Sequence, residues 1–503
     1  MFRLSRRAGP RLAVDATARS LAGRRELEWL TENAVRARSA DAGFRLGGKD
    51  APGVRIGESI VGNLPLWASG LDTQVDIWGP RRGKTTARVV PAILDTWGPV
   101  LVTSTKRDVL DLTRGLRRDK GGPIIVFDPH GIAETPGDDE SDQYCWDPLA
   151  WVNPDCEGGE VRAAKLASHF AFSVQPSERH WDAAYLSDAE DLLAGLFLAA
   201  AVDHNATVRS VWEWVTNPSD MVPVQSLREH GRHFAANSLA SQYNQDYYIR
   251  ERVFGFARRM VRCLRNENVH SWVTPAASDR AVLDEREFLQ SHGTIYALTD
   301  ESHGSAAPLV SALAEAVIDT AMRLAGQTSG GRLRVPLLAV FDDAAHTTRW
   351  RELPTQYSRF GEAGIYAMTM LQSWSQGVRC WGADGMTDLW QAADLRIVGS
   401  GLDDIDFAQK YFAATGSTRR FCATDLLRLP RGRIVIVPTD NKPVLARTIP
   451  WWESEYAEQV RRNIRRDNDG DAPTDPVSAV EPTRVTGLPS EPDSSLEEIR
   501  PPA

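Results

Sequence analysis

QVDIWGPRRGKTTARVVPAILDTWGPVLVT, the stretch from Gln74 to Thr103, determines how the rest of the sequence is interpreted. An apolar run that ends at Trp78 is followed by the loop GPRRGKTT (Gly79–Thr86) and by a helix-like segment, Ala87–Thr96. This order is typical of a phosphate-binding loop, in which backbone N–H groups and a helix N-terminus converge on the phosphates of a nucleotide. The stretch therefore predicts a nucleotide site on an α/β fold.

The residues expected to contact the nucleotide are those of the loop: Gly79, Pro80, Arg81, Arg82, Gly83, Lys84, Thr85 and Thr86. The two arginines either add charge to the site or lie on its rim in solvent. In such a loop the lysine reaches the β and γ phosphates and the next hydroxyl binds Mg²⁺, roles that fall here to Lys84 and Thr85. The strict spacing places a glycine at position 78, where this chain has Trp78. Because Gly-Lys-Thr alone also fits a surface turn, the prediction depends on the flanking strand and helix.

Length and composition indicate a soluble protein of two or three domains. The chain has 503 residues, of which 42% are apolar and 25% charged, as is ordinary for globular proteins. Its five cysteines show neither close pairing nor metal-ligand spacing, which indicates free thiols in a reducing compartment. No apolar run approaches the roughly 20 residues that cross a bilayer, and the start lacks a secretory signal. We therefore expect a cytoplasmic protein without a transmembrane segment.

The charge is polarised between the two ends of the chain. Met1–Ser39 carries nine arginines against four acids, whereas the chain from Asp467 onward carries nine acids and two arginines. The net charge of -9 therefore does not indicate a basic nucleic-acid binder. We expect a basic N-terminal arm (1–50) with an amphipathic helix near Ala18–Val35, either solvated or in contact with anionic lipid or a membrane partner. A disordered acidic tail (464–503) is expected to contact partner proteins or only to aid solubility.

Strand-like and helix-like segments alternate in residues 51–150, which predicts βαβ units and a parallel sheet. Residues 151–280 are expected to be helical, and strand signals resume in residues 281–463. The predicted fold is an α/β nucleotide-binding domain in two sequence-distant parts, with an all-α domain inserted between them. The expected strands are Val75–Ile77, Val100–Ser104, Ile124–Phe127, Thr294–Leu298, Leu337–Phe341, Ile365–Leu371, Leu395–Val398 and Ile434–Val437.

Polar residues that directly follow two of these strands complete the expected site. Asp342 and Asp343 follow Leu337–Phe341, where an ATPase needs one acid for the Mg²⁺ shell and another to polarise the attacking water. Glutamate is more usual as the second acid, and the shorter aspartate places its carboxylate roughly 1.5 Å back. Asp343 is therefore either the general base or only a helix N-cap. Gln372 ends the next strand and is expected to sense the γ-phosphate.

The order of these motifs resembles the coupling ATPases of bacterial conjugation and type IV secretion, the TraG/TraD class. The resemblance is carried by GPRRGKTT, PAIL, GPVLVTSTKRDVLDLTR, IIVFDP with WDPL, DDAA and LQSWSQ, and covers roughly Val54 to Pro450. It implies a RecA-like domain interrupted by an all-α domain, in a homo-hexameric ring that binds ATP and Mg²⁺ between subunits. It also implies single-stranded DNA with its relaxase, or protein, as cargo for a type IV secretion channel.

The resemblance assigns Lys84 and Thr85 to Walker A, Asp342 to Walker B, Asp343 to the position of the family's glutamate and Gln372 to motif three. The N-terminal transmembrane helices of the family are absent from this sequence, so we expect attachment to the inner face of the cell membrane through a separate anchoring subunit or the basic N-terminus. The family's trans-acting arginine falls on Gly361; Arg359 is either its replacement or a solvent-exposed charge.

These observations predict a Mg²⁺-dependent ATPase that drives DNA or protein transfer. One alternative is a nucleotide-binding adaptor that scarcely hydrolyses ATP, which Trp78 and Asp343 favour. Another is a double-stranded-DNA pump of the septal translocase kind, although the sequence shows no C-terminal winged-helix pattern.

Overall fold

The computed structural model describes residues 11–48, 50–133, 142–152, 158–174, 182–300, 305–412, 421–439 and 441–468. Its strands are β1 (Val54–Ser59), β2 (Pro65–Ala68), β3 (Gln74–Ile77), β4 (Val100–Ser104), β5 (Ile124–Phe127), β6 (Tyr144–Cys145), β7 (Ala281–Val282), β8 (Thr294–Leu298), β9 (Leu337–Phe341), β10 (Ile365–Leu371), β11 (Leu395–Val398), β12 (Arg433–Pro438) and β13 (Val444–Arg447).

The α-helices are α1 (Glu32–Asp41), α2 (Val90–Asp95), α3 (Asp108–Asp119), α4 (Pro148–Val152), α5 (Gly159–Phe172), α6 (Asp182–Val202), α7 (Val208–Thr216), α8 (Val222–Glu229), α9 (His233–Tyr243), α10 (Tyr247–Met260), α11 (Glu267–Val273), α12 (Glu285–Leu289), α13 (Ala307–Gly326), α14 (Ala344–Thr347), α15 (Leu353–Ala363), α16 (Trp374–Ala392), α17 (Ile405–Phe407), α18 (Ala423–Leu427) and α19 (Ala457–Asn468). Short 3₁₀ and π turns are η1 (Ala13–Ser20), η2 (Arg24–Leu30), η3 (Thr85–Val89), η5 (Arg262–Arg265), η6 (Pro275–Ala277), η7 (Ala408–Phe412) and η8 (Trp451–Glu453).

One large mixed sheet organises the fold. Within the described residues it has 11 strands in the order β2-β1-β13-β12-β11-β3-β10-β9-β4-β8-β5. The strands from β11 to β5 pair in parallel, as expected from the alternation of strands and helices. The strands from β2 to β12 pair antiparallel at one edge. The predicted α/β class is confirmed, whereas β1, β2 and β13 were not among the expected strands.

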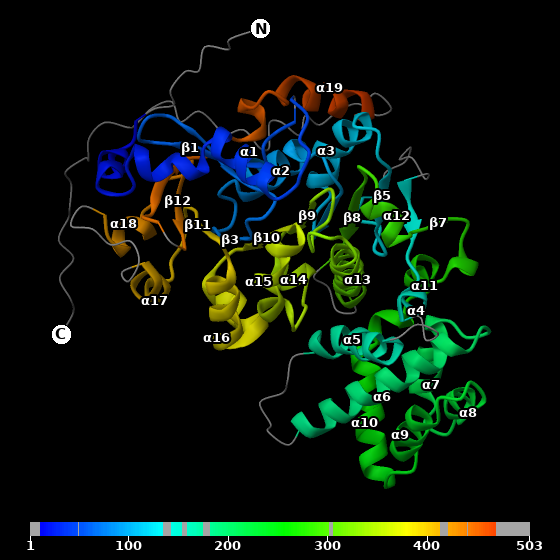
Figure 1. Cartoon of the computed structure of the whole chain (residues 1–503). Coiled ribbons are helices and arrows are strands. Elements are labelled where there is room, and N and C mark those ends of the chain that lie inside the picture. The colour runs from blue at the N-terminus through cyan, green and yellow to red at the C-terminus, as the bar shows by residue number, and fades with distance from the viewer. Residues whose placement is uncertain are drawn as a thin grey trace, which may run out of the picture.

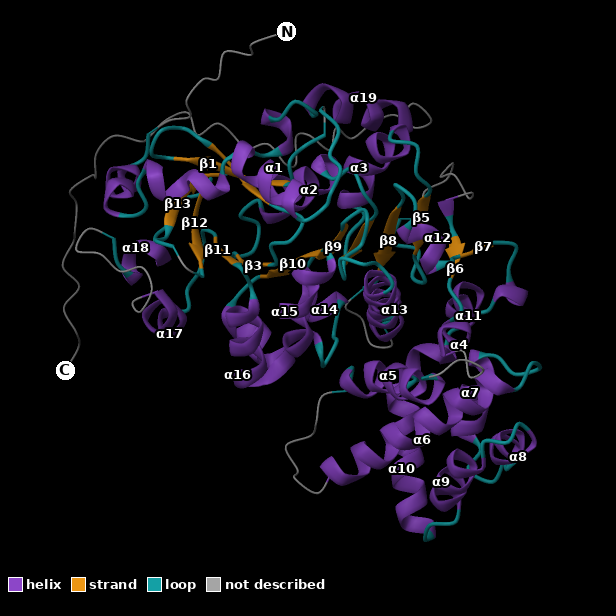
Figure 2. Cartoon of the chain, in the orientation of Figure 1, coloured by secondary structure: helices purple, strands orange, loops and turns teal. Residues whose placement is uncertain are grey.

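Helices cover both faces of this sheet, which gives three layers (Figures 1 and 2). Along β9, Leu337, Ala339 and Phe341 join the hydrophobic cluster shared with α13, α15 and α16. Leu338 and Val340 point to the other face and join the cluster shared with α2 and α3. Strands buried on both faces are nearly continuous apolar runs, which explains why they were predictable from sequence.

The helices α4 to α11 lie to one side of the sheet, at the lower right of Figure 1. The chain leaves the sheet through β6 and returns through β7, and these two short strands pair in parallel. Buried side chains of α5, α6 and α10 form one continuous cluster with those of α13. The boundaries of the five proposed domains stay a prediction.

The N-terminal segment differs from the expectation. Two 3₁₀ turns, η1 and η2, and the helix α1 replace the single amphipathic helix predicted for Ala18–Val35. Residues 11–48 are not a solvated arm, because Leu27, Leu30 and Val35 are fully buried. Residues 1–10 and most of the predicted acidic tail, from residue 469 on, lie outside the described residues. Residues 464–468 of that tail belong to α19.

Candidate functional site

The predicted phosphate loop connects β3 to the helical segment formed by η3 and α2. The backbone N–H of Trp78 donates to the carbonyl of Leu371 (3.0 Å), and Ala87 N donates to Gly83 O (2.9 Å). The loop turns through two left-handed residues, Arg81 (φ 56°) and Gly83 (φ 93°). Such a conformation suits glycine and is strained for arginine, and strain of this kind clusters at functional sites.

The loop is one residue shorter than the strict motif, and the helix after it begins with a π turn. The π turn η3 spans Thr85–Val89. A π turn holds one more residue than an α turn, and π turns are frequent at functional sites. The missing loop residue and the additional helical residue are thus close together in sequence, and α2 still buries Val90, Ala92 and Ile93. The one-residue offset at Trp78 is therefore accommodated without loss of the core contacts of the helix.

Three neighbouring strands bring the remaining candidate residues to Lys84. Asp342 and Asp343 follow β9, and Gln372 follows β10, which lies between β9 and β3. Lys84 Nζ forms an ion pair with Asp343 and lies 3.3 Å from Asp342 Oδ1. Thr85 Oγ1 donates to Asp342 Oδ2 (3.3 Å), and Gln372 Nε2 donates to Asp343 Oδ1 (3.0 Å).

Burial and the mutual contacts of these charges set their protonation. Burial raises the pKa of Asp342 and favours its neutral form, although the nearby Lys84 opposes this shift. Burial acts in the same direction on Asp343, but the charge and hydrogen bond of Lys84 outweigh it and lower its pKa. For Lys84, burial disfavours the ammonium, yet the two carboxylates raise its pKa. The lysine is therefore charged, and Asp343 is the carboxylate it holds ionised.

Asp343 has a left-handed backbone, with φ 50° and ψ 49°. It precedes α14, but its side chain forms no capping hydrogen bond to that helix. Aspartate tolerates this conformation better than most residues do. The carboxylate is thus directed to Lys84 and Gln372, and the alternative interpretation of Asp343 as a helix cap does not describe its contacts.

A turn after β11 holds the other side of the phosphate loop. Gly79 N donates to Ser400 O (3.0 Å), and a Cβ on Gly79 would lie 2.0 Å from the carbonyl oxygen of Gly401. A Cβ on Gly399 would lie 2.2 Å from the buried indole ring of Trp78. Trp78 is therefore packed under this turn, a long-range contact whose only sequence signal is the small-residue run GSG after a strand.

The arginine expected from a neighbouring subunit has no place at Gly361. That residue is buried in α15, and a Cβ there would lie 2.2 Å from Leu71 O. Arg359 is exposed on the same helix. Within the described residues it forms no hydrogen bond or ion pair. On the phosphate loop, Pro80, Arg81 and Arg82 are exposed, whereas Thr86 Oγ1 donates to Gly83 O (3.2 Å).

Residues 336–422 match the family model described as the TraM recognition site of TraD and TraG. Over this segment the chain is similar to the TraG/TraD coupling proteins. The matched segment includes β9, β10 and β11, and thus both acids and the glutamine of the site. No curated protein matched the chain in a sequence comparison.

Solved structures of coupling proteins and of VirB4 share the fold. The unbound monoclinic form of the conjugative coupling protein TrwBdeltaN70 superposes with a TM-score of 0.57 and 13% identity over 83% of this chain and 91% of that one. TrwB in complex with ADP and Mg²⁺ gives a TM-score of 0.57 and 13% identity, covering 83% and 92%. VirB4 of Thermoanaerobacter pseudethanolicus gives 0.50 and 12%, covering 83% and 100%. At these identities the likeness concerns the fold alone.

The residues of the TraG/TraD-like site fit a Mg²⁺ ion. Mg²⁺ uses one or two protein oxygens together with waters and substrate phosphates, and Thr85 Oγ1 and Asp342 Oδ2 provide such a pair. No group of three or more His, Cys, Asp or Glu side chains suited to a metal occurs in the described ranges. Among those same residues no helix has the length and apolar character required to span a membrane.

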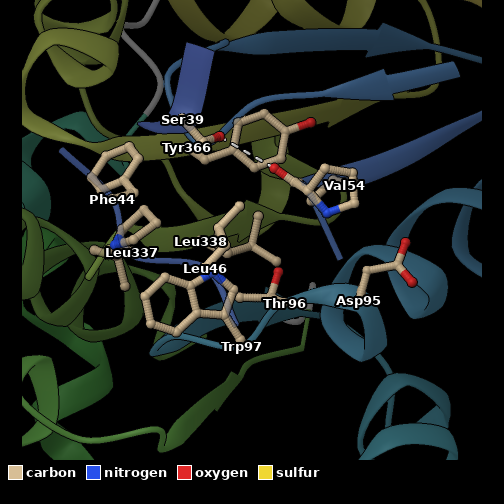
Figure 3. A pocket seen from close by; sticks show the side chains of 14 residues that line it. Ser39, Phe44, Leu46, Val54, Asp95, Thr96, Trp97, Leu337, Leu338 and Tyr366 are labelled. Atoms are coloured by element: carbon tan, nitrogen blue, oxygen red, sulfur yellow. Dashed lines mark hydrogen bonds between the residues drawn. The ribbon is translucent and has the colours of Figure 1, made fainter. Parts of the chain in front are cut away.

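A small cavity lies at the opposite end of the strands, beside Ser39, Phe44, Trp97 and Tyr366 (Figure 3). Its volume of about 30 Å³ suits no more than a water molecule or two. It borders Leu337, the first residue of β9, whereas Asp342 follows the last residue of that strand. The cavity therefore belongs to the packing of the N-terminal segment and not to the candidate site.

Proposed function

We propose that this coupling-protein relative is a Mg²⁺-dependent ATPase that powers transfer of DNA with its attached relaxase, or of protein cargo, to a type IV secretion channel in conjugation. The observation that carries the proposal is the convergence of Lys84, Thr85, Asp342, Asp343 and Gln372 at one end of three adjacent strands. These are the residue types that phosphoryl transfer to water requires.

The ion pair between Lys84 and Asp343 supports a proposed role for each residue in the reaction. Lys84 leaves the pair to bind the β and γ phosphates, which removes the charge that lowers the pKa of Asp343. Asp343 thereby becomes a stronger base, and its carboxylate accepts a proton from the attacking water. Thr85 and Asp342 would hold Mg²⁺, which neutralises charge on the phosphates. Gln372 lies beside Asp343 and is placed to detect loss of the γ-phosphate.

The segment that follows the two acids provides a route to the helical domain. Arg351 forms two hydrogen bonds of 2.9 Å with the carboxylate of Glu190 on α6. The buried Trp350 accepts a hydrogen bond from Trp381 Nε1 (2.9 Å) on α16, the helix that follows Gln372. Trp350 therefore lies in the segment that follows β9 and also contacts the helix that follows β10. We propose that γ-phosphate loss is relayed to the helical domain through this segment.

The proposed partners follow from the resemblance and the family description. A homo-hexameric ring, single-stranded DNA, a relaxase and a secretion channel are proposed, together with a TraM-like partner. Because β9, β10 and β11 are buried in the sheet, a TraM-like partner would contact the exposed sides of α15 and α16. Membrane attachment is proposed through a separate subunit or the basic N-terminus. Sedimentation with neither liposomes nor membrane fractions would remove that last proposal.

The first experiment measures Mg²⁺-dependent ATP hydrolysis with and without single-stranded DNA. Asp343→Asn is expected to lower hydrolysis by roughly 100-fold or more while nucleotide binding persists. Lys84→Ala is expected to lose both. Ser375→Ala, an exposed change close to Gln372, is the matched control with unchanged activity. If the wild type binds ATP but its turnover stays at background with and without DNA, the adaptor alternative replaces the motor.

A further inference from the structure

The candidate site holds too little positive charge for its proposed ligand. Lys84 is within ion-pair distance of both Asp342 and Asp343, and the charge of Lys106 also acts on Asp343, so the two acids already offset these two cations. A Mg²⁺-bound nucleoside triphosphate adds a further net charge of about -2. Phosphoryl-transfer sites balance such charge with arginine, whose fork-shaped guanidinium matches phosphate oxygens. An arginine without a protein partner at the same end of the sheet would supply this charge.

Arginines of this kind lie on the phosphate loop itself. Gly361 has no room for a side chain beside Leu71 O, and Arg359 is exposed on α15. Arg81 and Arg82 lie immediately before Gly83 and Lys84, and both are exposed. Within the part of the chain that the structure describes, neither forms an ion pair or a hydrogen bond through its side chain. Two cations therefore remain available at the mouth of the site.

The position of Arg82 is fixed by the turn after β11. A Cβ on Gly401 would lie 2.5 Å from Arg82 Nε and 2.9 Å from Arg82 Cγ. The side chain of Arg82 thus lies along Gly401, in space that only a glycine leaves open. Because β11 and β10 flank β3 on opposite sides, this turn lies on the side of the loop away from Gln372. The Arg82 side chain therefore extends from the loop on the side away from the acids, where it does not compete with Lys84 for them.

We propose that Arg82 binds the phosphates of the nucleotide held by its own chain. The missing side chain of Gly401 leaves the space that the Arg82 side chain occupies. The inference rests on the proposed function, because it assumes that the site binds ATP. It names a further cation for the site that this chain supplies itself. Arg82 then contributes to ATP binding in the unassembled chain.

The test is equilibrium binding of fluorescent ATP and ADP analogues to dilute protein at fixed salt. Arg82→Gln is expected to weaken both by roughly 10- to 100-fold, since it removes charge-assisted hydrogen bonds. Arg82→Lys keeps the charge but loses the fork-shaped guanidinium, so its affinity for the analogues should lie between those of the wild type and of Arg82→Gln. Arg334→Gln, an exposed arginine just before the opposite end of β9, is the matched control and should bind as the wild type does.

A second pair of variants moves the guanidinium without removing it. Gly401→Ala places a methyl group against Arg82 and is expected to weaken nucleotide binding in the same direction as Arg82→Gln. Gly432→Ala controls for backbone strain, because its φ of 83° resembles the 84° of Gly401 but its Cβ would meet nothing within 4 Å. Wild-type affinity in Arg82→Gln would overturn the inference while leaving the proposed ATPase intact. If the wild type itself binds no nucleotide, both fall.

Discussion

Replacing Arg88 by methionine tests how the phosphate-loop helix is anchored beneath the site. Arg88 is fully buried in η3, and its Nε lies 3.1 Å from Asp76 Oδ2, itself fully buried on β3. The guanidinium also donates to the side chain of Gln74 and to the carbonyls of Arg55 (2.9 Å) and Ile56 (3.3 Å) on β1. Methionine keeps the apolar stem but leaves these acceptors without their donor.

The expected cost is about 3–5 kcal/mol of unfolding free energy, the usual effect of removing one partner from a buried ion pair. Burial raises the pKa of Asp76 even with Arg88 present, and removing Arg88 raises it further. Between about pH 4 and the raised folded pKa of Asp76, the folded state then binds more protons than the unfolded state. Stability of the variant must therefore fall as pH rises, by at most about 1.4 kcal/mol per pH unit.

Urea denaturation of Arg88→Met between pH 5 and 8 measures both effects. The double variant Arg88→Met/Asp76→Asn removes the unpaired charge; it should recover about 2 kcal/mol and lose the additional dependence on pH. A single variant within about 1 kcal/mol of the wild type at every pH would refute the reasoning. It would show that the ion pair contributes no more than a surface contact.

Two further variants test contacts that the motifs did not predict. Gly361→Ala is expected to cost about 1–3 kcal/mol in urea denaturation, because its Cβ would lie 2.2 Å from Leu71 O, whereas Gly326→Ala, with nothing within 4 Å, should cost nothing. Glu315 is fully buried, and its carboxylate lies 2.7 Å from His169 Nε2. Burial alone would raise the pKa of Glu315, but the hydrogen bond and charge of His169 lower that pKa. Its stabilising effect is thus complete above its unfolded pKa of about 4.3 and is lost as pH falls through the folded value. Glu315→Gln should therefore destabilise the protein at pH 7 by about 3 kcal/mol and much less at pH 3; an equal loss at both would contradict the sign.

The central strands and the acids were predictable because their signals are local. Leu337–Phe341 is buried on both faces and reads as one apolar run, so β9 begins and ends where the sequence predicts it. The same run places Asp342 and Asp343 directly after a strand. Because the phosphate loop that contains Lys84 also follows a strand of the parallel sheet, the sequence was enough to predict that the acids and the lysine lie at the same edge of the sheet. The roles assigned to them stay predictions until hydrolysis is measured.

The edge of the sheet and the rim of the site were not predictable in this way. The strand β13 has four residues and pairs antiparallel with β1 and β12, which lie about 390 and 10 residues away in sequence. Short edge strands carry little periodicity, so their existence depends on partners distant in the chain. The contact of Trp78 with Gly399 is likewise non-local, and neither residue alone indicates the other.

The departures of this chain from the strict motif are accommodated by its own residues. Trp78 occupies the position of a glycine, and Gly399 leaves room for its ring. The shortened loop is followed by a π turn, and the steric exclusion of an arginine at Gly361 is accompanied by Arg82 beside Gly401. These contacts stabilise the fold whether or not the site turns ATP over, because a buried ring needs its packing partner in an active and an inactive protein alike. Their chemical consequence is therefore confined to nucleotide binding, and ATP hydrolysis by the wild type is the measurement that separates the motor from the nucleotide-binding adaptor.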